Sequence, residues 1–159
     1  MNTWTRTTLG LLFALSLAAC QTGRVNQPQW VETTTVAPSE AVIWNVALLA
    51  LQEQKFPIGA GVDPAKREAI TGWRNSLAPF KSEGYRQRVL LRLEPLDAGK
   101  YKLLLHVEKD TNEELAKPME LAYAQWEEAP DDIQTAQILI SKIEARLGGT
   151  IEIGLKSGK

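Results

Sequence analysis

Apolar and polar residues alternate most regularly in the middle of the chain, between Arg86 and Asp110. A period of two places successive side chains on opposite faces of a β-strand, so it predicts a sheet with one buried face. Leu96–Lys100 separates the two alternating runs, and Gly99 can supply the positive φ that a tight turn needs. We therefore predict a β-hairpin whose buried face consists of Val89, Leu91, Leu93, Tyr101, Leu103, Leu105 and Val107.

Charged residues on the other face of this hairpin select its register. If Leu93 lies opposite Leu103, Arg88 faces Glu108. A shift of two residues in one direction sets Arg88 against His106 and creates a like-charge pair, and the opposite shift keeps only one pair of unlike charges. Opposed unlike charges stabilise a strand pair by about 0.2–1 kcal/mol each, and like charges destabilise it to a similar extent. We predict the first register, which also pairs Glu94 with Lys102 and Arg86 with Asp110.

Helices are predicted before and after the strands. The first covers about Glu40 to Gln54, with Ser39 as its N-cap, and it is apolar nearly all round. Such a helix is usually buried on more than one side, or else it offers a face to lipid or to a partner helix. The second helix has Asp131 as its N-cap and ends at Gly148 and Gly149. Its apolar face consists of Ile133, Ala136, Ile140, Ile143 and Leu147.

The remaining segments have weaker patterns. Alternation over Lys66 to Arg74 predicts a strand, and the polar break Asp110 to Lys117 precedes a looser strand pattern over Met119 to Trp126. Thr150 to Leu155 also alternates and fits either an edge strand or a loose tail. The glycines within Ile58 to Pro64 lack the spacing of a phosphate-binding loop, so we expect a short strand or turn there.

These elements predict an α+β fold. Each helix and the central strands have one apolar face, and packing these faces together gives a two-layer sandwich. We expect an antiparallel sheet of three to five strands with the N-terminal and C-terminal helices on one of its faces. This domain is predicted at residues 39–148, followed by a C-terminal strand or tail at 149–159.

The N-terminal stretch has the layout of a secretory signal peptide. Arg6 precedes an apolar run from Leu9 to Ala19, and Cys20, the only cysteine of the chain, follows it. The run is too short to cross a bilayer, which takes about 20 apolar residues. Its end resembles the lipobox of bacterial lipoproteins at every position, in Leu17, Ala18, Ala19 and Cys20.

The resemblance implies that residues 1–19 are a signal peptide, which signal peptidase II removes by cleavage before Cys20. It also implies diacylglycerol on the sulfur of Cys20 and an acyl chain such as palmitate on its new amino group. In enteric bacteria an Asp after the cysteine retains lipoproteins in the inner membrane, and Gln21 stands at that position here. The implied location is therefore the periplasmic side of the outer membrane, with the periplasmic face of the inner membrane as the alternative.

Residues 20–38 are predicted to be the lipidated cysteine and a flexible tether, because 21–38 is polar and has no sustained period. Trp30 interrupts this segment and either docks on the domain, touches lipid headgroups or is simply exposed. After cleavage 17 basic and 19 acidic residues remain, a net charge of −2, which argues against strong attraction to nucleic acid. Acylation of Cys20 leaves no thiol for a disulfide, so packing must stabilise the fold.

Candidate catalytic groups are few. His106, the only histidine, is predicted to be a solvated strand residue opposite Leu90. The histidine, cysteine and carboxylate residues lack the spacing of a metal site, so we expect no metal and no cofactor beyond the lipid on Cys20. The acidic residues around Pro130 fit a helix start better than paired-carboxylate catalysis, and we do not expect an enzyme.

Binding is the more open question. Arg86, Arg88 and Arg92 share one face of a strand, and together with Trp73 they are the candidate binding residues for an anionic group. The alternative is a solvated face on which these arginines form salt bridges with acidic residues of the next strand. The chain also has several tryptophans that fill the core or line a ligand groove, namely Trp44, Trp73 and Trp126.

These features favour a small outer-membrane lipoprotein that acts as a non-enzymatic interaction or scaffolding module, with a protein partner in the envelope. The order helix, sheet, helix over residues 39–148 loosely resembles the helix-grip domains of lipoprotein C of the β-barrel assembly machine. That resemblance implies only an analogy of role. The alternative function is a periplasmic carrier or sensor that holds an apolar ligand between helix and sheet, and the oligomeric state stays open.

Overall fold

The structure is a computed structural model. It describes residues 27–77 and 83–156, with side chains as far as residue 148, so the predicted signal peptide and lipobox lie outside the described residues. The elements in chain order are β1 (Val31–Val36), α1 (Glu40–Glu53), β2 (Val62–Asp63), β3 (Glu68–Ile70), β4 (Arg74–Ser76), β5 (Tyr85–Pro95), β6 (Lys100–Asn112), the 3₁₀ turn η1 (Leu121–Tyr123), β7 (Trp126–Ala129) and α2 (Ile133–Lys156).

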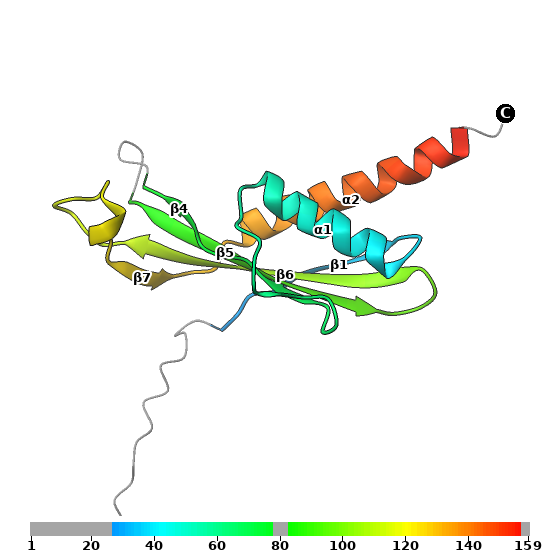
Figure 1. Cartoon of the computed structure of the whole chain (residues 1–159), viewed down its shortest axis with the longest axis horizontal. Coiled ribbons are helices and arrows are strands. Elements are labelled where there is room, and N and C mark those ends of the chain that lie inside the picture. Colours follow the sequence, from blue (N-terminus) through cyan, green and yellow to red (C-terminus); the bar gives the residue numbers. More distant parts are fainter. Residues whose placement is uncertain (1–26, 78–82, 157–159) are drawn as a thin grey trace, which may run out of the picture.

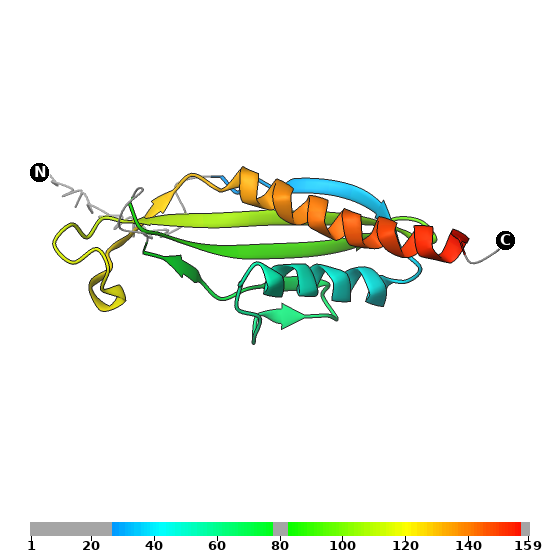
Figure 2. The same ribbon diagram turned by 90° about the horizontal axis from the view of Figure 1, so that it is seen from above.

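The strands form one antiparallel sheet of seven strands, in the order β1-β6-β5-β3-β2, with β4 also paired to β5 and β7 to β6. Helices α1 and α2 lie side by side on one face of this sheet (Figures 1 and 2). The predicted α+β two-layer arrangement is confirmed. The sheet exceeds the expected three to five strands because it includes β2, β3 and β4, which have only two or three residues each.

The long β5–β6 hairpin has the predicted register. Leu93 lies opposite Leu103 and Arg88 lies opposite Glu108, and the other two predicted charge pairs are aligned as well. Gly99 has a φ of 73° in the turn, as expected. Strands β1, β3, β4 and β7 all pair directly with β5 or β6, so this hairpin positions the rest of the sheet.

One layer of buried side chains fills the space between helices and sheet. Helix α1 contributes Ile43 and Leu51 and helix α2 contributes Leu139 and Ile143, and all four side chains are fully buried. Ser39 caps α1 as predicted, since its hydroxyl accepts a hydrogen bond from the Val42 amide. Each large apolar side chain buried in this layer stabilises the fold by about 1.5–3 kcal/mol.

The predicted tether is wrong for Val31–Val36, which form strand β1. This segment pairs along its whole length with β6, and the Thr33 hydroxyl donates a 2.5 Å hydrogen bond to Glu144 of α2. Valine and threonine favour strands, and an edge strand needs a partner on one side only. A polar, threonine-rich strand of this kind has too few apolar residues to produce a clear periodic signal.

The strand predicted over Lys66 to Arg74 is divided into β3 and β4. At the break, the Val89 amide donates a 2.9 Å hydrogen bond to the Thr71 hydroxyl in place of a backbone carbonyl. The Gly72 amide donates to the Pro57 carbonyl instead of to a neighbouring strand. The strand predicted over Met119 to Trp126 is also wrong. Strand β6 includes the first three residues of the expected polar break and ends at Asn112, and a loop with the η1 turn precedes β7.

Helix α2 differs from its prediction at both ends. Asp132 caps it, because its carboxylate accepts a 2.8 Å hydrogen bond from the Thr135 amide, and Asp131 is used elsewhere. Ile133 is 40% exposed, so the buried face begins at Ala136. The helix also continues through Gly148 and Gly149 to Lys156, and no strand forms over 150–155 in the described part of the chain. A glycine permits a helix end without requiring one.

Candidate functional site

The sheet has one face that no described helix covers, which we call the helix-free face (Figure 1). Alternation along β5 and β6 determines which side chains lie on it, because the residues between the buried core positions point away from α1 and α2. On these two strands they are Arg86, Arg88, Leu90, Arg92, Lys102, Leu104, His106, Glu108 and Asp110.

Two arginines and two tryptophans stack on this face and form what we call the Arg–Trp ladder: Trp73, Arg86, Arg88 and Trp126. The guanidinium carbon of Arg86 lies 4.3 Å from the ring centre of Trp73 and 5.0 Å from that of Trp126. The guanidinium of Arg88 lies 4.7 Å from the ring of Trp73. Contacts of this kind stabilise by about 0.5–1 kcal/mol each when exposed, and they fix the planes of the rings.

Both arginines of the ladder also form the ion pairs that the hairpin register predicted. Arg86 Nε lies 2.8 Å from Asp110 Oδ2, and Arg88 pairs with the Glu108 carboxylate. The carboxylates are the buried partners, since the Asp110 and Glu108 side chains are only 9% and 8% exposed. Removal of either arginine would take an ion-pair partner from a buried carboxylate, which is unfavourable.

Arg92 is separate from the ladder. Its Nε lies 2.8 Å from Glu68 Oε1 on β3, and its guanidinium lies 5.0 Å from the ring of Trp30. Four residues of strand, about 13 Å, separate it from Arg88. Of the four candidate binding residues, the structure therefore brings Trp73, Arg86 and Arg88 together and leaves Arg92 at a second position.

The prediction that His106 is solvated is wrong. Its position opposite Leu90 is as predicted, but its side chain is only 1% exposed. The ring of Trp30 covers it at a centroid distance of 5.3 Å, and its Nε2 lies 2.7 Å from Asp131 Oδ2. Both covering residues come from segments distant in sequence, which strand alternation cannot reveal.

Asp131 links this histidine to the start of the fold. The same carboxylate oxygen, Oδ2, accepts a 2.8 Å hydrogen bond from the Gln29 amide. Because the ionised Asp131 carboxylate can only accept, Nε2 of His106 carries the hydrogen of the His106–Asp131 bond. The other ring nitrogen of His106, Nδ1, is buried without a hydrogen-bond partner among the described residues. Residues 29 and 30 are therefore docked on the helix-free face, which resolves the open question about Trp30.

The other tryptophans divide between the two faces. Of the tryptophans that the structure describes, only Trp44 belongs to the helix–sheet core, where it is 8% exposed. Trp73 and Trp126 lie on the helix-free face beside Arg86. They therefore do not line a groove between helix and sheet. The sequence alone did not distinguish these positions, because Trp73 follows the break in the strand and Trp126 begins a strand that the pattern misplaced.

Lys102 on the helix-free face and Arg74 on the other side of the sheet both have shifted pKa values. A 2.6 Å ion pair with Glu32 raises the pKa of Lys102 above its ordinary range. On the opposite side of the sheet, burial lowers the pKa of Arg74, whose guanidinium donates to the Gln54 carbonyl at 2.7 Å and lies 4.1 Å from the ring of Phe56. Arg74 thereby attaches the C-terminal end of α1 to β4.

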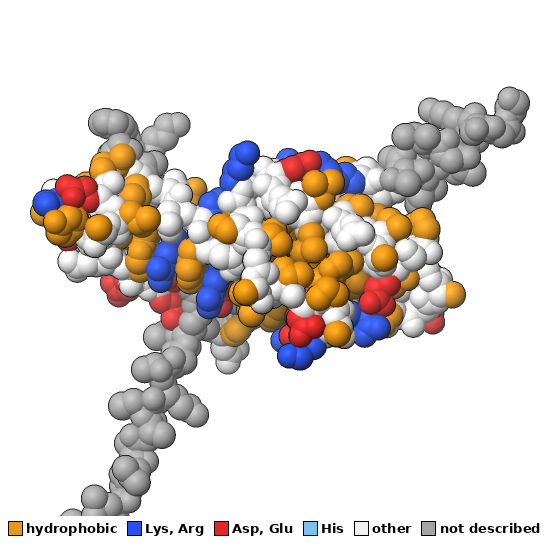
Figure 3. All heavy atoms as spheres, in the orientation of Figure 1, with side chains coloured by type: hydrophobic (Ala, Val, Ile, Leu, Met, Phe, Trp, Pro, Cys, Tyr) orange, Lys and Arg blue, Asp and Glu red, His pale blue; other side chains and the backbone are white. Residues whose placement is uncertain are grey.

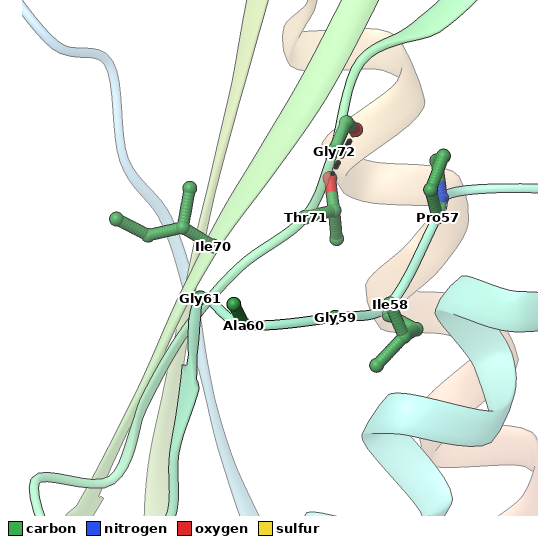
Figure 4. A pocket seen from close by; sticks show the side chains of 8 residues that line it. All are labelled: Pro57, Ile58, Gly59, Ala60, Gly61, Ile70, Thr71 and Gly72. Atoms are coloured by element: carbon green, nitrogen blue, oxygen red, sulfur yellow. Dashed lines mark hydrogen bonds between the residues drawn. The ribbon is translucent and has the colours of Figure 1, made fainter.

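A cavity of about 320 Å³ lies beside the end of α1, between residues 57–61 and residues 70–72 (Figure 4). Gly61 is required there, since a Cβ would come within 2.3 Å of the Ile70 carbonyl oxygen. None of the residues that line this cavity is ionisable. Among the described residues, no group of three histidine, cysteine or acidic residues is arranged to hold a metal ion.

No helix in the described part of the chain is both long and apolar enough to cross a membrane. Comparison with models of known protein families finds no match for the chain, and comparison with curated proteins finds none either.

We expect Asp131→Ala to release the N-terminal segment. The variant loses both the Gln29 and the His106 hydrogen bonds, so the free energy of unfolding should fall by about 1–3 kcal/mol. Amide hydrogen exchange should become faster at Gln29 and at the first residues of β1, because Asp131 accepts from the Gln29 amide.

The adjacent variant Asp132→Ala is the matched control. It removes the cap of α2 and also the acceptor of the buried Gln87 side-chain amide, which together cost about 1–3 kcal/mol. It should increase exchange at Thr135 while leaving Gln29 protected. Equal exchange at Gln29 in both variants would contradict the docking of this segment by Asp131.

Proposed function

We propose that the chain is a lipid-anchored envelope protein whose folded part is a non-enzymatic interaction or scaffolding module. The anchor is Cys20 in the sequence Leu17-Ala18-Ala19-Cys20, with diacylglycerol on the sulfur and an acyl chain on the amino group. The periplasmic face of the outer membrane is the proposed location, and Gln21 after the cysteine supports it over the inner membrane.

The observation that carries the interaction role is the Arg–Trp ladder on the helix-free face. Arginine and tryptophan are enriched at protein–protein interfaces and among the residues that dominate binding energy. Stacking and ion pairing hold these side chains in one arrangement before a partner arrives, so little side-chain entropy is lost on binding. We propose that a protein of the envelope binds this face.

The charges beneath the ladder favour a protein partner over a polyanion. Each arginine of the ladder is already paired with a buried carboxylate, so the face has little net charge to attract nucleic acid. A guanidinium has five N–H donors and keeps some of them after one carboxylate is bound. The ladder can therefore offer both aromatic surface and hydrogen-bond donors to a polar protein surface.

The proposal of a non-enzymatic role is supported by the positions of the ionisable groups. His106, the residue best suited to acid–base chemistry, is buried between Trp30 and Asp131 and is closed to a substrate. Glu108 and Asp110 are engaged by arginines. The surface cavity beside α1 is large enough for a small molecule, but its lining has no ionisable side chain to act as a general acid or base.

The alternative of a carrier or sensor for an apolar ligand is less well supported. Such a ligand would have to lie between the helices and the sheet. That layer is occupied by fully buried side chains of both, including Ile43, Leu91, Leu105 and Ile143. A carrier would require these residues to move apart, with the loss of the packing that stabilises the domain.

The anchor is tested with Cys20→Ser. We expect this variant to lose labelling by a radioactive or alkyne-bearing fatty acid and to keep its signal peptide, because the resemblance makes the modified thiol the signal for cleavage. The substitution exchanges one sulfur atom for oxygen at a position outside the described residues. Lipid-free wild-type chain that has nevertheless lost residues 1–19 would contradict the anchor.

The interaction surface is tested by photo-crosslinking in intact cells. A photoreactive residue replaces Asn75, which is exposed on β4 opposite Arg86, and in the control it replaces Gln137, which is exposed on α2. We expect one defined protein adduct from position 75, none of that mass from position 137, and a several-fold lower yield at 75 when Trp73→Ala is added. The same adduct from both positions, or from α2 alone, would contradict binding through the helix-free face.

A further inference from the structure

The loop between β6 and β7, residues 113–125, exposes an unusual amount of apolar surface. Leu115 is 86% exposed, and Met119, Leu121 and Tyr123 are between 51% and 52% exposed. This β6–β7 loop forms one end of the elongated molecule (Figures 1 and 2), where apolar side chains are visible on the surface (Figure 3). Contiguous exposed apolar side chains mark surfaces that contact a protein or a membrane.

The backbone of this loop is held by the side chain of Asn112, the last residue of β6. The side-chain oxygen of Asn112, a residue only 3% exposed, accepts hydrogen bonds from the amides of Glu114 and Gln125 at 3.1 and 3.0 Å. The Asn112 amide group donates to the Pro118 carbonyl at 3.3 Å. These bonds satisfy backbone groups of the loop from within, while the side chains of Glu113, Lys117 and Glu120 stay exposed beside the apolar ones.

Glu114 closes the same loop from a second side. Its Oε1 accepts from the amides of Ala116 and Lys117 at 2.8 and 3.1 Å, and its Oε2 accepts from Gln125 Nε2 at 3.0 Å. These bonds satisfy backbone groups that would otherwise need water. The loop can therefore leave water with its apolar side chains outward and with little backbone desolvation.

Side chains typical of a membrane interface accompany the apolar ones. Lys117 Nζ lies 4.0 Å from the ring centre of Tyr123. Tyrosine is enriched at the level of lipid headgroups, and lysine extends its charge toward water while its methylene stem stays in apolar surroundings. Acidic residues outnumber Lys117 in the loop, so a zwitterionic bilayer suits it better than an anionic one.

The start of the described chain lies near the same end of the sheet. Strand β1 runs antiparallel to β6, so the residues before Val31 run toward the end of β6 from which the loop emerges. The Gln29 amide bonds to Asp131, close behind β7. The backbone amide of Asp132, the next residue, donates to the carbonyl of Val107. Five residues of strand, about 17 Å, separate Val107 from Asn112, where the loop begins.

The chain between anchor and fold is short. Only seven residue steps separate Cys20 from Gln27, which is at most about 25 Å even when fully extended. This span is comparable with the distance from the docked segment to the loop. A bilayer that holds the acyl chains on Cys20 is therefore within reach of the loop as well.

We propose that the β6–β7 loop is a second membrane contact, which inserts Leu115, Met119, Leu121 and Tyr123 into the interfacial region of the bilayer that holds Cys20. This inference rests on the proposed lipid anchor. Because Cys20 already holds the chain at the bilayer, the loop contact is intramolecular. Four apolar side chains, which would be too few to bind a membrane by themselves, are then enough to orient the domain on the bilayer. The Arg–Trp ladder then has a fixed orientation relative to the membrane.

The test uses the chain from Cys20 onward, which contains every described element. Its single thiol is coupled to a maleimide phospholipid in vesicles of phosphatidylcholine and phosphatidylethanolamine. A photoreactive residue replaces Leu121, and in the matched control it replaces Leu49, which is 45% exposed on α1. We expect phospholipid adducts from position 121, at a yield at least tenfold higher than from position 49.

A second pair of variants relates the contact to the apolar side chains. In the coupled chain with the probe at 121, Leu115→Ser should lower the lipid-adduct yield severalfold, and Leu49→Ser should leave it unchanged. Leu115 is 86% exposed, so its replacement removes no core packing.

Equal lipid adducts from 121 and 49 would overturn the proposal, as would protein–protein adducts at 121, which would indicate a second copy of the chain on the loop. Because the coupling is chemical, the result does not depend on lipidation in cells. Failure of the loop contact is thereby distinguishable from failure of the anchor, which the fatty-acid labelling of Cys20→Ser tests separately.

Discussion

The structure depends on the β5–β6 hairpin, whose two faces meet opposite physical requirements. On one face the apolar side chains receive both helices, and on the other face arginines of β5 lie opposite carboxylates of β6. A one-residue slip would exchange the two faces, and a two-residue slip would break the charge pairs. The packed core and the Arg–Trp ladder therefore depend on the same register. This is why the helix-free face can hold buried carboxylates without a covering layer of helices.

The docked N-terminal segment leads the chain away from the sheet toward the end that has the β6–β7 loop. Since residues 29 and 30 are held by Asp131 and His106, the chain between the proposed anchor and the fold is much shorter than the whole of residues 20–38. A long tether would let the domain approach the membrane in any orientation. With a short one, the nearby β6–β7 loop is the part of the fold most readily brought to the bilayer. The ladder would then face the proposed protein partner in a restricted range of orientations.

The sequence predicted the parts of the fold that have local physical causes. Cross-strand charges fixed the pairs of Arg86 and Arg88, and Ser39 and Gly99 marked a helix start and a turn. Contacts between distant segments were not predictable in this way. His106 and Trp30 lie 76 positions apart in the chain, and neither residue carries a local signal of their contact. The β6–β7 loop was missed because its apolar residues resembled a strand. In the structure the amides of Glu114 and Gln125 donate hydrogen bonds to the Asn112 side chain and hold the segment in a loop.

Hydroxyl-radical footprinting of the protein in its native membranes, compared with the same protein after extraction, tests the central claim most directly. Tryptophan, methionine and tyrosine are the side chains whose oxidation is followed. Trp73 and Trp126 report on the proposed partner, Met119 and Tyr123 report on the bilayer, and the buried Trp44 is the internal control. We expect all four reporters to be less oxidised in the membrane than after extraction, with Trp44 slow to oxidise in both. Equal oxidation of the reporters in the two states would contradict a protein that works through its helix-free face while its loop contacts the membrane.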